Sequence, residues 1–379
     1  MRENLVTTSL VIIILLVTGS AAVAASFAGL GDFPGGLTSS VAFGVSGDGA
    51  TVVGAGNHPG LRVEAFRWTA SGGLVGIGVP TGCVWSEAYS ASADGSVIAG
   101  WGYRTPIGDS FNRAAYRWTA ETGIMSLGDL PGGPDRSFAN AVSNDGSTIV
   151  GQGRSAKGSE AFRWTEAEGM VGIGDLPGGA FGSEAYAVSA DGSVIVGVAS
   201  DETGIVPFRW TESGAMARLP SMDGGFTAGI AQNVSPDGTA IVGRLSAPLA
   251  SQAFRWTEAD GTIGLGDLPG GAYYSSAYGV SGDGSVVVGY SSSAANSATA
   301  FIWDASHGMR PLRDVLVNDY GLNLDGWELG FANDISFDGT VIVGGGTDPS
   351  GNGQAWMAVI PEPATLSLFC IALACRRRR

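Results

Sequence analysis

The feature of this sequence that most constrains its fold is an internal repeat. The pattern Ser-x-Asp-Gly occurs seven times, and each copy is followed by a short apolar run and a glycine. The copies begin at Ser46, Ser92, Ser143, Ser189, Ser235, Ser281 and Ser336, at spacings of 46, 51, 46, 46, 46 and 55 residues. A chain without regular structure has no reason to keep this register, so each copy is expected to mark one structural unit.

Two further signatures lie between these copies. An aromatic-Arg-Trp-Thr segment begins at Phe66, Tyr116, Phe162, Phe208 and Phe254, and it survives in part at Phe301 and Trp356. A Leu-Gly-Asp-Leu-Pro-Gly-Gly segment begins at Leu127 and Leu265, with a close copy at Ile173. In the unit around Ser189, two apolar strands flank the Asp191-Gly192 hairpin turn, since Asp-Gly readily adopts the positive φ angles of such turns. The aromatic-Arg-Trp-Thr segment is a third strand, and a fourth leads into the Pro-Gly-Gly break. Four antiparallel strands in about 46 residues are typical of a propeller blade.

The ends of the repeat predict how the fold closes. The last unit stops after its third strand, at Val359-Ile360, and the missing fourth strand occurs near the N-terminus, at 30–36. We expect Leu30 to Pro34 to pair with the strand at Trp356 to Val359. The sequence therefore predicts an all-β fold over 26–360, a seven-bladed β-propeller of four-stranded blades closed by an N-terminal strand that completes the last blade. A β-solenoid is the alternative.

The repeated polar residues have structural interpretations. The turn aspartates could bind calcium, but such sites need six or more converging oxygens, so turn geometry is favoured. The serine two residues before each aspartate is expected to bond the turn backbone. The repeated arginines, such as Arg163 and Arg255, are expected between blades, with the aspartate of the Leu-Gly-Asp motif as a candidate partner.

The two ends of the chain predict export. Arg2, an apolar run from Leu10 to Val17 and small residues at 22–24 have the order of a secretory signal peptide, assigned to 1–25. The segment 361–379 combines a Pro-Glu-Pro motif, a short apolar stretch and an arginine cluster, which resembles a PEP-CTERM sorting signal. Its motif residues are Pro361, Glu362, Pro363, Arg376, Arg377, Arg378 and Arg379.

This resemblance implies an exosortase-type sorting protease as a partner. It also implies transient anchoring of the tail in the inner membrane, tail removal, and delivery to the cell surface or the exopolysaccharide matrix. The apolar stretch is shorter than the roughly 17 residues that normally span a bilayer. The repeats themselves resemble HAF-type extracellular repeats, through Ala-Phe-Arg-Trp-Thr, Leu-Gly-Asp-Leu-Pro-Gly-Gly and Val-Ser-x-Asp-Gly. That family implies an extracellular location and supplies no defined activity.

Charge and residue types narrow the function. The net charge of −15 argues against a nucleic-acid partner. Cys83 is the one cysteine outside the sorting tail, so an internal disulfide is not expected. The two histidines, His58 and His307, sit in no recognisable constellation, and the spacing of ligand residues indicates no metal or other cofactor. We therefore expect a non-catalytic structural or adhesive protein of the surface or matrix. The alternative is a glycan- or protein-binding module, and a propeller hydrolase or lyase is a third reading.

Breaks in the repeat mark where a binding site is expected. Because the strands alternate in direction, the second-to-third and fourth-to-first loops leave the same face of the disc. The insertions at 102–113 and 314–329 both fall in these loops. Aromatic residues outside the repeat collect in these loops: Trp85, Trp101, Tyr103, Tyr273, Tyr274, Tyr320 and Trp327. Exposed rings on a rigid scaffold can stack on a ligand, so this loop-rich face is the candidate site. The alternative is that several of these rings cover the core.

Overall fold

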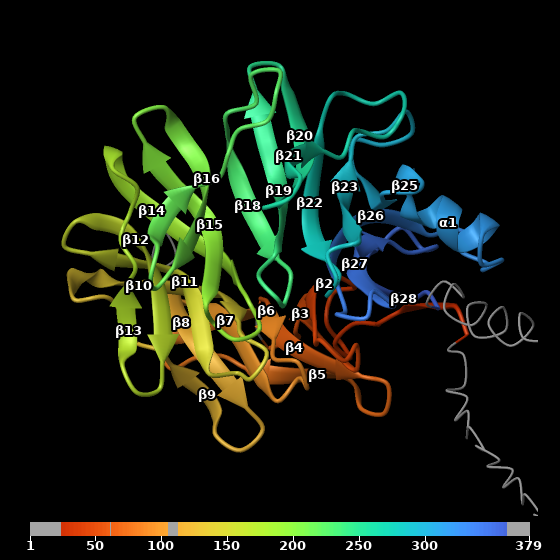
Figure 1. Cartoon of the computed structure of the whole chain (residues 1–379). Helices are drawn as coiled ribbons and strands as arrows, with labels where there is room; N and C mark the ends of the chain where they lie inside the picture. The colour runs from red at the N-terminus through yellow and green to blue at the C-terminus, as the bar shows by residue number, and fades with distance from the viewer. Residues whose placement is uncertain (1–23, 61, 105–112, 362–379) are drawn as a thin grey trace, which may run out of the picture.

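The computed structural model describes residues 24–60, 62–104 and 113–361. These residues form antiparallel β-sheets and one short helix, α1 (Leu312–Asn318). Five sheets have four strands, and one has eight, which we treat as two halves because a single parallel pair, Ser159 with Gly182, joins them. The predicted all-β fold of four-stranded antiparallel units is confirmed, and their arrangement resembles a propeller (Figure 1).

The sheets follow one another in chain order, and we number them I to VII with the eight-stranded sheet as III and IV. Sheet I contains β2 (Ser40–Val45), β3 (Thr51–Gly56), β4 (Glu64–Thr69) and β5 (Gly73–Gly78). Sheet II contains β6 (Cys83–Ala91), β7 (Val97–Arg104), β8 (Arg113–Thr119) and β9 (Gly123–Ser126). Sheet III contains β10 (Gly132–Val142), β11 (Thr148–Ser155), β12 (Gly158–Thr165) and β13 (Gly169–Gly172). Sheet IV contains β14 (Gly178–Val188), β15 (Val194–Asp201), β16 (Gly204–Thr211) and β17 (Ala215–Arg218).

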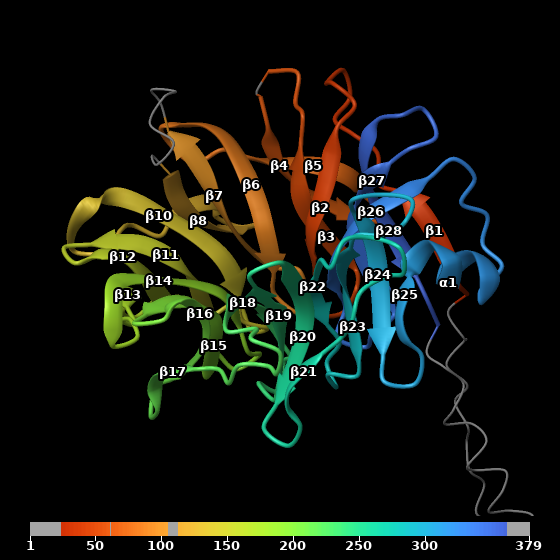
Figure 2. The same ribbon diagram turned by 90° about the horizontal axis from the view of Figure 1, so that it is seen from above.

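The remaining sheets repeat this plan. Sheet V contains β18 (Ala228–Val234), β19 (Ala240–Ala247), β20 (Ala250–Thr257) and β21 (Gly261–Gly264). Sheet VI contains β22 (Ser275–Val280), β23 (Val286–Ser291), β24 (Thr299–Asp304) and β25 (Gly308–Pro311). Sheet VII contains β26 (Glu328–Ile335), β27 (Val341–Thr347), β28 (Gly353–Val359) and the N-terminal strand β1 (Ser26–Gly29). Figure 2 shows the sheets succeeding one another around the molecule, with the red N-terminal strands beside the blue C-terminal ones.

The Ser-x-Asp-Gly segment forms the turn between the first two strands of each sheet, as predicted. In sheet II, the Ser92 hydroxyl donates to the Asp94 carboxylate at 2.8 Å, and the backbone N–H of Val97 donates to the Ser92 hydroxyl at 3.0 Å. Gly95 adopts a φ of 66°, which the turn requires and which glycine tolerates without a Cβ clash. The same serine-to-aspartate bond occurs in all seven copies.

The strand that completes sheet VII is β1, which lies earlier in the chain than predicted. Ser26 pairs with Val359 and Gly29 pairs with Trp356, whereas the expected partner was Leu30 to Pro34. Pairing ends because Gly31 takes a φ of 80° and turns the chain away. The Leu30 N–H still donates to the Ala355 carbonyl at 2.9 Å, as Leu127 does to Ala115 in sheet II. The Leu-Gly-Asp motif is therefore the turn that follows the fourth strand.

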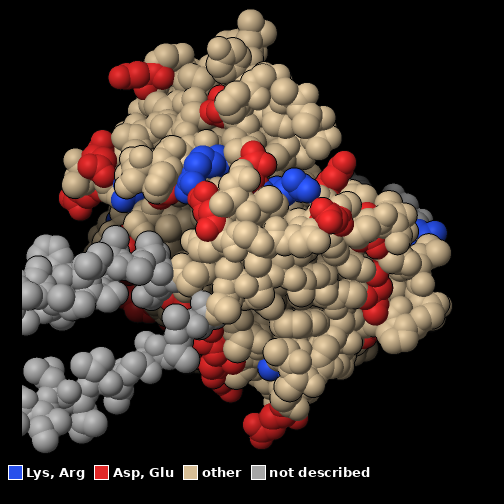
Figure 3. Space-filling view, turned by 90° about the vertical axis from the view of Figure 1, so that its right-hand side faces the viewer, with Lys and Arg blue, Asp and Glu red and all other residues tan. Residues whose placement is uncertain are grey.

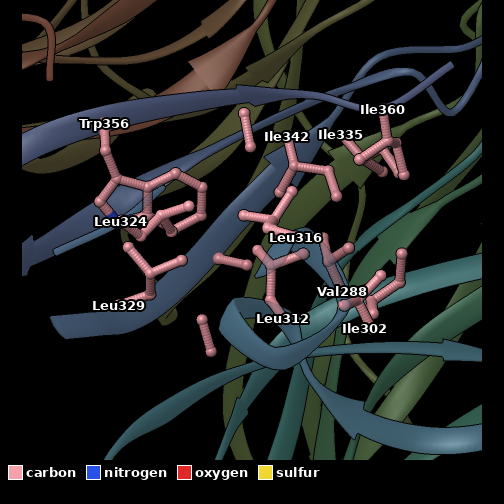
Figure 4. Packing of buried hydrophobic residues seen from close by; sticks show 14 residues of the cluster. Val288, Ile302, Leu312, Leu316, Leu324, Leu329, Ile335, Ile342, Trp356 and Ile360 are labelled. Carbon is pink, nitrogen blue, oxygen red and sulfur yellow. The ribbon is translucent and has the colours of Figure 1, made fainter. Parts of the chain in front are cut away.

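Hydrophobic clusters fill the spaces between adjacent sheets. The first aromatic residue of each aromatic-Arg-Trp-Thr segment is fully buried, and Trp356 occupies the equivalent position in sheet VII. There, Leu312 and Leu316 of α1 pack with Ile335 and Trp356, so part of the 314–329 insertion belongs to the core (Figure 4).

The predicted pairing of the repeated arginines with the Leu-Gly-Asp aspartates is wrong. Arg163 lies 2.8 Å from Glu168 and Arg255 lies 3.2 Å from Asp260, both acids of the turn that follows the same strand. Each arginine side chain reaches this acid within its own hairpin, and therefore without extending to a neighbouring sheet. Asp175 instead accepts the backbone N–H of Gly182 at 2.6 Å.

The predicted terminal signals lie almost entirely outside the described residues, which include only 24–25 of the first and Pro361 of the second. Within the described chain, no helix is long and apolar enough to span a membrane.

Candidate functional site

A cavity lies along the first strands of the sheets, and we call it the central channel. Each of these strands has a β-bulge at the same repeat position, for example between Ala88 and Ser90 in β6. A bulge re-aims the side chain of its extra residue, and bulges are common beside functional sites. The bulged residues all line the channel: Phe43, Tyr89, Asn140, Tyr186, Gln232, Tyr278 and Asn333.

The channel has a volume of about 380 Å³ and a mixed aromatic and amide lining. Phe331 and Phe337 add two more rings to those of the bulged residues. Among the described lining residues, Asp334 is the one that carries a formal charge. A cavity of this size can hold a small ligand or one end of a longer one.

Asp334 is held by backbone groups from two sheets. Its carboxylate accepts the N–H of Val45 from sheet I at 3.0 Å and the N–H of Ile335 at 2.9 Å. It forms no ion pair with the described arginines and lysine. Desolvation by the surrounding protein raises the pKa of Asp334 to about 7, although the two backbone donors act in the opposite direction.

A groove leads away from the channel on the loop-rich face. A cavity of about 340 Å³ between sheets I and VII shares Phe331 with the channel. A further cavity of about 540 Å³ shares Asn296 and Glu328 with this one and extends over the 314–329 insertion. The three cavities are therefore neighbours in one series, and we call the two that lie outside the channel the groove.

The groove is lined by small and apolar residues together with hydroxyl and amide side chains, and an aromatic ring lies toward each end. The charged residues of its lining are Arg313, Asp314 and Glu328. Ser39, Ser297 and Thr347 supply hydroxyls beside Asn296. Phe331 is 40 % exposed where the groove meets the channel. At the other end Trp327 packs edge-on against Phe27, with ring centres 5.2 Å apart.

Trp85 lies on β6 and Trp101 and Tyr103 lie on β7 of sheet II, and two of these three residues are buried. Trp101 and Tyr103 are each 7 % exposed, and the rings of Trp85 and Tyr103 are 4.7 Å apart. The Arg113 guanidinium lies 4.2 Å from the centre of the Trp101 ring, a cation–π contact. This cluster is packed internally and leaves little ring surface for a ligand.

The carboxyl group beside this cluster is partly shielded from water. Glu87 accepts the Tyr89 hydroxyl at 2.8 Å. Desolvation raises the pKa of Glu87, against the opposing effects of that hydrogen bond and of the Arg113 charge.

Tyr273 and Tyr274 are adjacent in sequence but differ in their surroundings. Tyr273 is 76 % exposed. Tyr274 is half-buried, and its hydroxyl bonds Arg244 and accepts a hydrogen bond from Tyr290 at 2.9 Å. The Tyr290 ring in turn packs against Phe331, with centres 4.9 Å apart, so this cluster supports the channel mouth.

Trp327 alone of the seven predicted aromatics lines the groove, whereas Tyr273 is exposed outside it and the other five are buried or half-buried. Tyr320 and Trp327 pack against the core cluster of sheet VII, and Trp327 also lines the groove. Sequence reasoning missed the channel-lining residues and Phe331. A usable signal was present, because the residue after the alanine of each first strand varies among Phe, Tyr, Asn and Gln while the alanine before it is the same in all seven copies.

Charged groups are dispersed over the side of the molecule that carries β28 and α1. Acidic side chains are scattered there with fewer basic ones among them (Figure 3). In the described chain, no three residues among His, Cys, Asp and Glu are grouped so as to hold a metal ion.

The comparisons with known proteins reveal the fold alone. No family model and no curated protein sequence matches this chain. An oligogalacturonate lyase in complex with manganese is similar in structure, with a TM-score of 0.53 and 13 % identity over 90 % of this chain and 98 % of that one. An oligogalacturonate lyase from Vibrio parahaemolyticus gives a TM-score of 0.53 and 10 % identity over the same shares. A puromycin hydrolase S511A mutant complexed with PGG gives 0.52 and 14 %, over 84 % of this chain and 53 % of that one.

Proposed function

We propose that this protein is an exported, non-catalytic adhesive component of the cell surface or exopolysaccharide matrix. In this proposal, its body is a closed seven-bladed β-propeller that binds a neutral polysaccharide along the groove. The succession of neighbouring cavities is the observation that carries the binding proposal, because adjacent cavities share Phe331, Asn296 and Glu328 as lining residues. A linear polymer needs such a succession, whereas a small metabolite needs one enclosed pocket.

Hydrogen bonds between successive turns support the closed ring. Ala93 donates its backbone N–H to Asn144, Asn144 to Ala190, and Ala190 to Pro236, at 2.8 to 3.2 Å. Pro236 has no N–H to continue this series. Beyond it, Gly282 donates to Phe337, and Phe337 donates to Gly47 in the first sheet at 3.1 Å. Together with the pairing of β1 and β28, these contacts connect the two ends of the chain.

The hydroxyl and amide side chains of the groove favour a sugar polymer. Hydroxyl and amide groups both donate and accept hydrogen bonds, and so match the hydroxyls of a sugar. Phe331 and Trp327 offer apolar surface for the faces of sugar rings. The net charge of −15 disfavours a polyanionic partner.

The sequence signals at the two ends support the proposed location. The signal at 1–25 directs export, and the tail at 361–379 resembles a substrate of an exosortase-type protease, which would follow transient anchoring in the inner membrane.

The positions of the histidines support a binding role without catalysis. His58 lies 3.6 Å from Glu64 in sheet I, whereas His307 contacts Asp304 in a turn of sheet VI. Each histidine is paired with a local carboxylate, and neither lines the channel or the groove.

A glycan array that carries neutral and acidic polysaccharides tests the proposal. We expect the purified protein to bind at least one neutral polymer and to leave its chain length unchanged. Binding to no glycan, or to acidic polymers alone, contradicts the proposed ligand. Shortening of a bound polymer, detected by size-exclusion chromatography, contradicts the non-catalytic assignment and favours a hydrolase or lyase.

A further inference from the structure

The hydrogen bonds of the channel-lining side chains determine what the channel presents to a ligand. The Asn333 amide donates to the Ala42 carbonyl of sheet I at 2.8 Å. The Asn140 amide donates to the Ala185 carbonyl of the next sheet, also at 2.8 Å. Each amide therefore uses its N–H group inside the protein and keeps a carbonyl oxygen free to accept.

Two further lining groups also donate into the protein. The Asn233 amide N–H donates to the Tyr278 carbonyl at 2.9 Å, and its carbonyl oxygen already accepts the backbone N–H of Val234 at 2.8 Å. The Tyr89 hydroxyl donates to Glu87, so its oxygen retains acceptor capacity. The side chains of Gln232 and Asn144 form no hydrogen bond with the described residues. Either the N–H or the carbonyl group of these two amides can therefore face the channel.

Asp334 adds a negative charge to this lining of acceptors and aromatic faces. Its two recorded donors are backbone N–H groups, which carry no formal charge. No Arg or Lys is among the described residues that line the channel. An ionised carboxylate away from bulk water is costly unless a cation compensates it.

We propose that the central channel binds an organic ammonium group, which pairs with Asp334 and lies against the aromatic rings of the lining. An ammonium N–H donates to the free carbonyl and carboxylate oxygens, and the ring faces attract its positive charge. A hard metal ion is a poorer match, since it needs six or more converging oxygens. This occupant is separate from the polysaccharide of the groove.

The sequence itself provides conservative replacements for Asp334. The equivalent repeat positions hold Ser90 in sheet II and Asn233 in sheet V. The Ser90 hydroxyl accepts the backbone N–H of Val142 at 3.3 Å, as Asp334 accepts that of Val45. Asp334→Ser and Asp334→Asn therefore remove the charge and keep a side chain that this scaffold already accepts.

Calorimetric titration with three probes of similar length tests the proposal: n-butylammonium, n-butanol and butyrate. Measurement at pH 8 keeps Asp334 mostly ionised, because its pKa is about 7. We expect one butylammonium to bind per chain, with n-butanol and butyrate weaker by roughly ten-fold or more, since a charge-assisted hydrogen bond is lost. Asp334→Asn and Asp334→Ser should weaken butylammonium binding to a similar degree.

The exposed carboxyl of Asp223 supplies the matched control, and Asp223→Asn should bind butylammonium as the wild type does. Equal affinity for butylammonium and n-butanol would overturn the proposal. So would saturable binding that survives both Asp334 substitutions in folded protein, or the absence of binding in the millimolar range. A positive glycan array beside a negative butylammonium titration would overturn this inference and leave the groove proposal standing.

Discussion

Val45 donates its backbone N–H to the carboxylate of Asp334 at 3.0 Å, although 289 positions separate the two residues in the chain. Their neighbours are also joined, because the Asn333 amide donates to the Ala42 carbonyl. The first strand of sheet I is thus connected to the first strand of sheet VII by side chains, and β1 adds a second connection at the outer edge of sheet VII. Loss of either connection should lower the free energy of unfolding of the whole protein.

Deletion of residues 26–36 should destabilise the entire protein. The deletion removes β1 together with Leu30 and Phe33, which are each 6 % exposed in the core. Loss of two buried side chains predicts a decrease of about 4 kcal/mol or more in the free energy of unfolding, measured by urea denaturation. Deletion of residues 24–25 is the control and should have little effect. An unchanged unfolding midpoint after removal of 26–36 would show that β1 does not contribute to closure.

The repeat allowed the strands and turns to be predicted because their chemistry is local. Ser92 and Asp94 form the same turn bonds wherever the motif occurs. The register of closure was predicted incorrectly because the motif glycine takes a positive φ, at Gly31 as at Gly128 and Gly266, and this conformation ends the strand before the motif.

The groove could not be predicted from sequence spacing. It is assembled from segments near Ser39, Asn296 and Glu328, which are far apart in the chain. The channel lining depends on a bulge at the same position of each first strand, and the sequence spacing does not reveal these bulges. Of the aromatic residues named from the sequence, Trp327 lines the groove.

Trp101→Ala should destabilise the protein strongly, whereas Tyr273→Ala should change its stability very little. Trp101 is 7 % exposed and holds Arg113, so its truncation should cost about 3–5 kcal/mol in the free energy of unfolding. Tyr273 is 76 % exposed, so its truncation should change that energy by less than about 0.5 kcal/mol. Chemical denaturation of both variants measures this difference. A Trp101→Ala variant as stable as Tyr273→Ala would mean that the sheet II aromatic cluster is not part of the core.

Acid should weaken the turns between the first two strands. Hydrogen bonds from the Ser96 hydroxyl and backbone N–H, and from Ser92, lower the pKa of Asp94 to about 2, below its ordinary 3.8. A lowered pKa in the folded state gives stability that is present above about pH 4 and is lost as the pH falls toward 2.

Thermal unfolding of wild-type protein and Asp94→Asn between pH 7 and pH 2 isolates this contribution. The wild type should be the more stable at pH 7, and the difference between the two melting temperatures should shrink as the pH falls through this range. A difference that stays constant down to pH 2 would exclude the turn carboxylate as its source.

Surface-extracted protein should lack the arginine cluster at 376–379. An exosortase-type protease would remove the tail beyond Pro363, so intact-mass spectrometry should find a shortened C-terminus. A variant in which Pro361, Glu362 and Pro363 are replaced by alanine should keep the tail and remain with the membrane fraction. Recovery of full-length protein from the surface would contradict the sorting proposal.

The affinity of the Phe331→Ala variant for the neutral polysaccharide selected on the array tests the central claim most directly. Phe331 joins the groove to the channel and is 40 % exposed, so its removal should take away stacking surface while leaving the fold intact. We expect the affinity to fall by about five-fold or more, as for an interface anchor worth roughly 1 kcal/mol or more. Leu249→Ala, at a residue that is 96 % exposed on another sheet, should bind as the wild type does. Equal affinity of the wild type and folded Phe331→Ala would contradict the groove as the polysaccharide site.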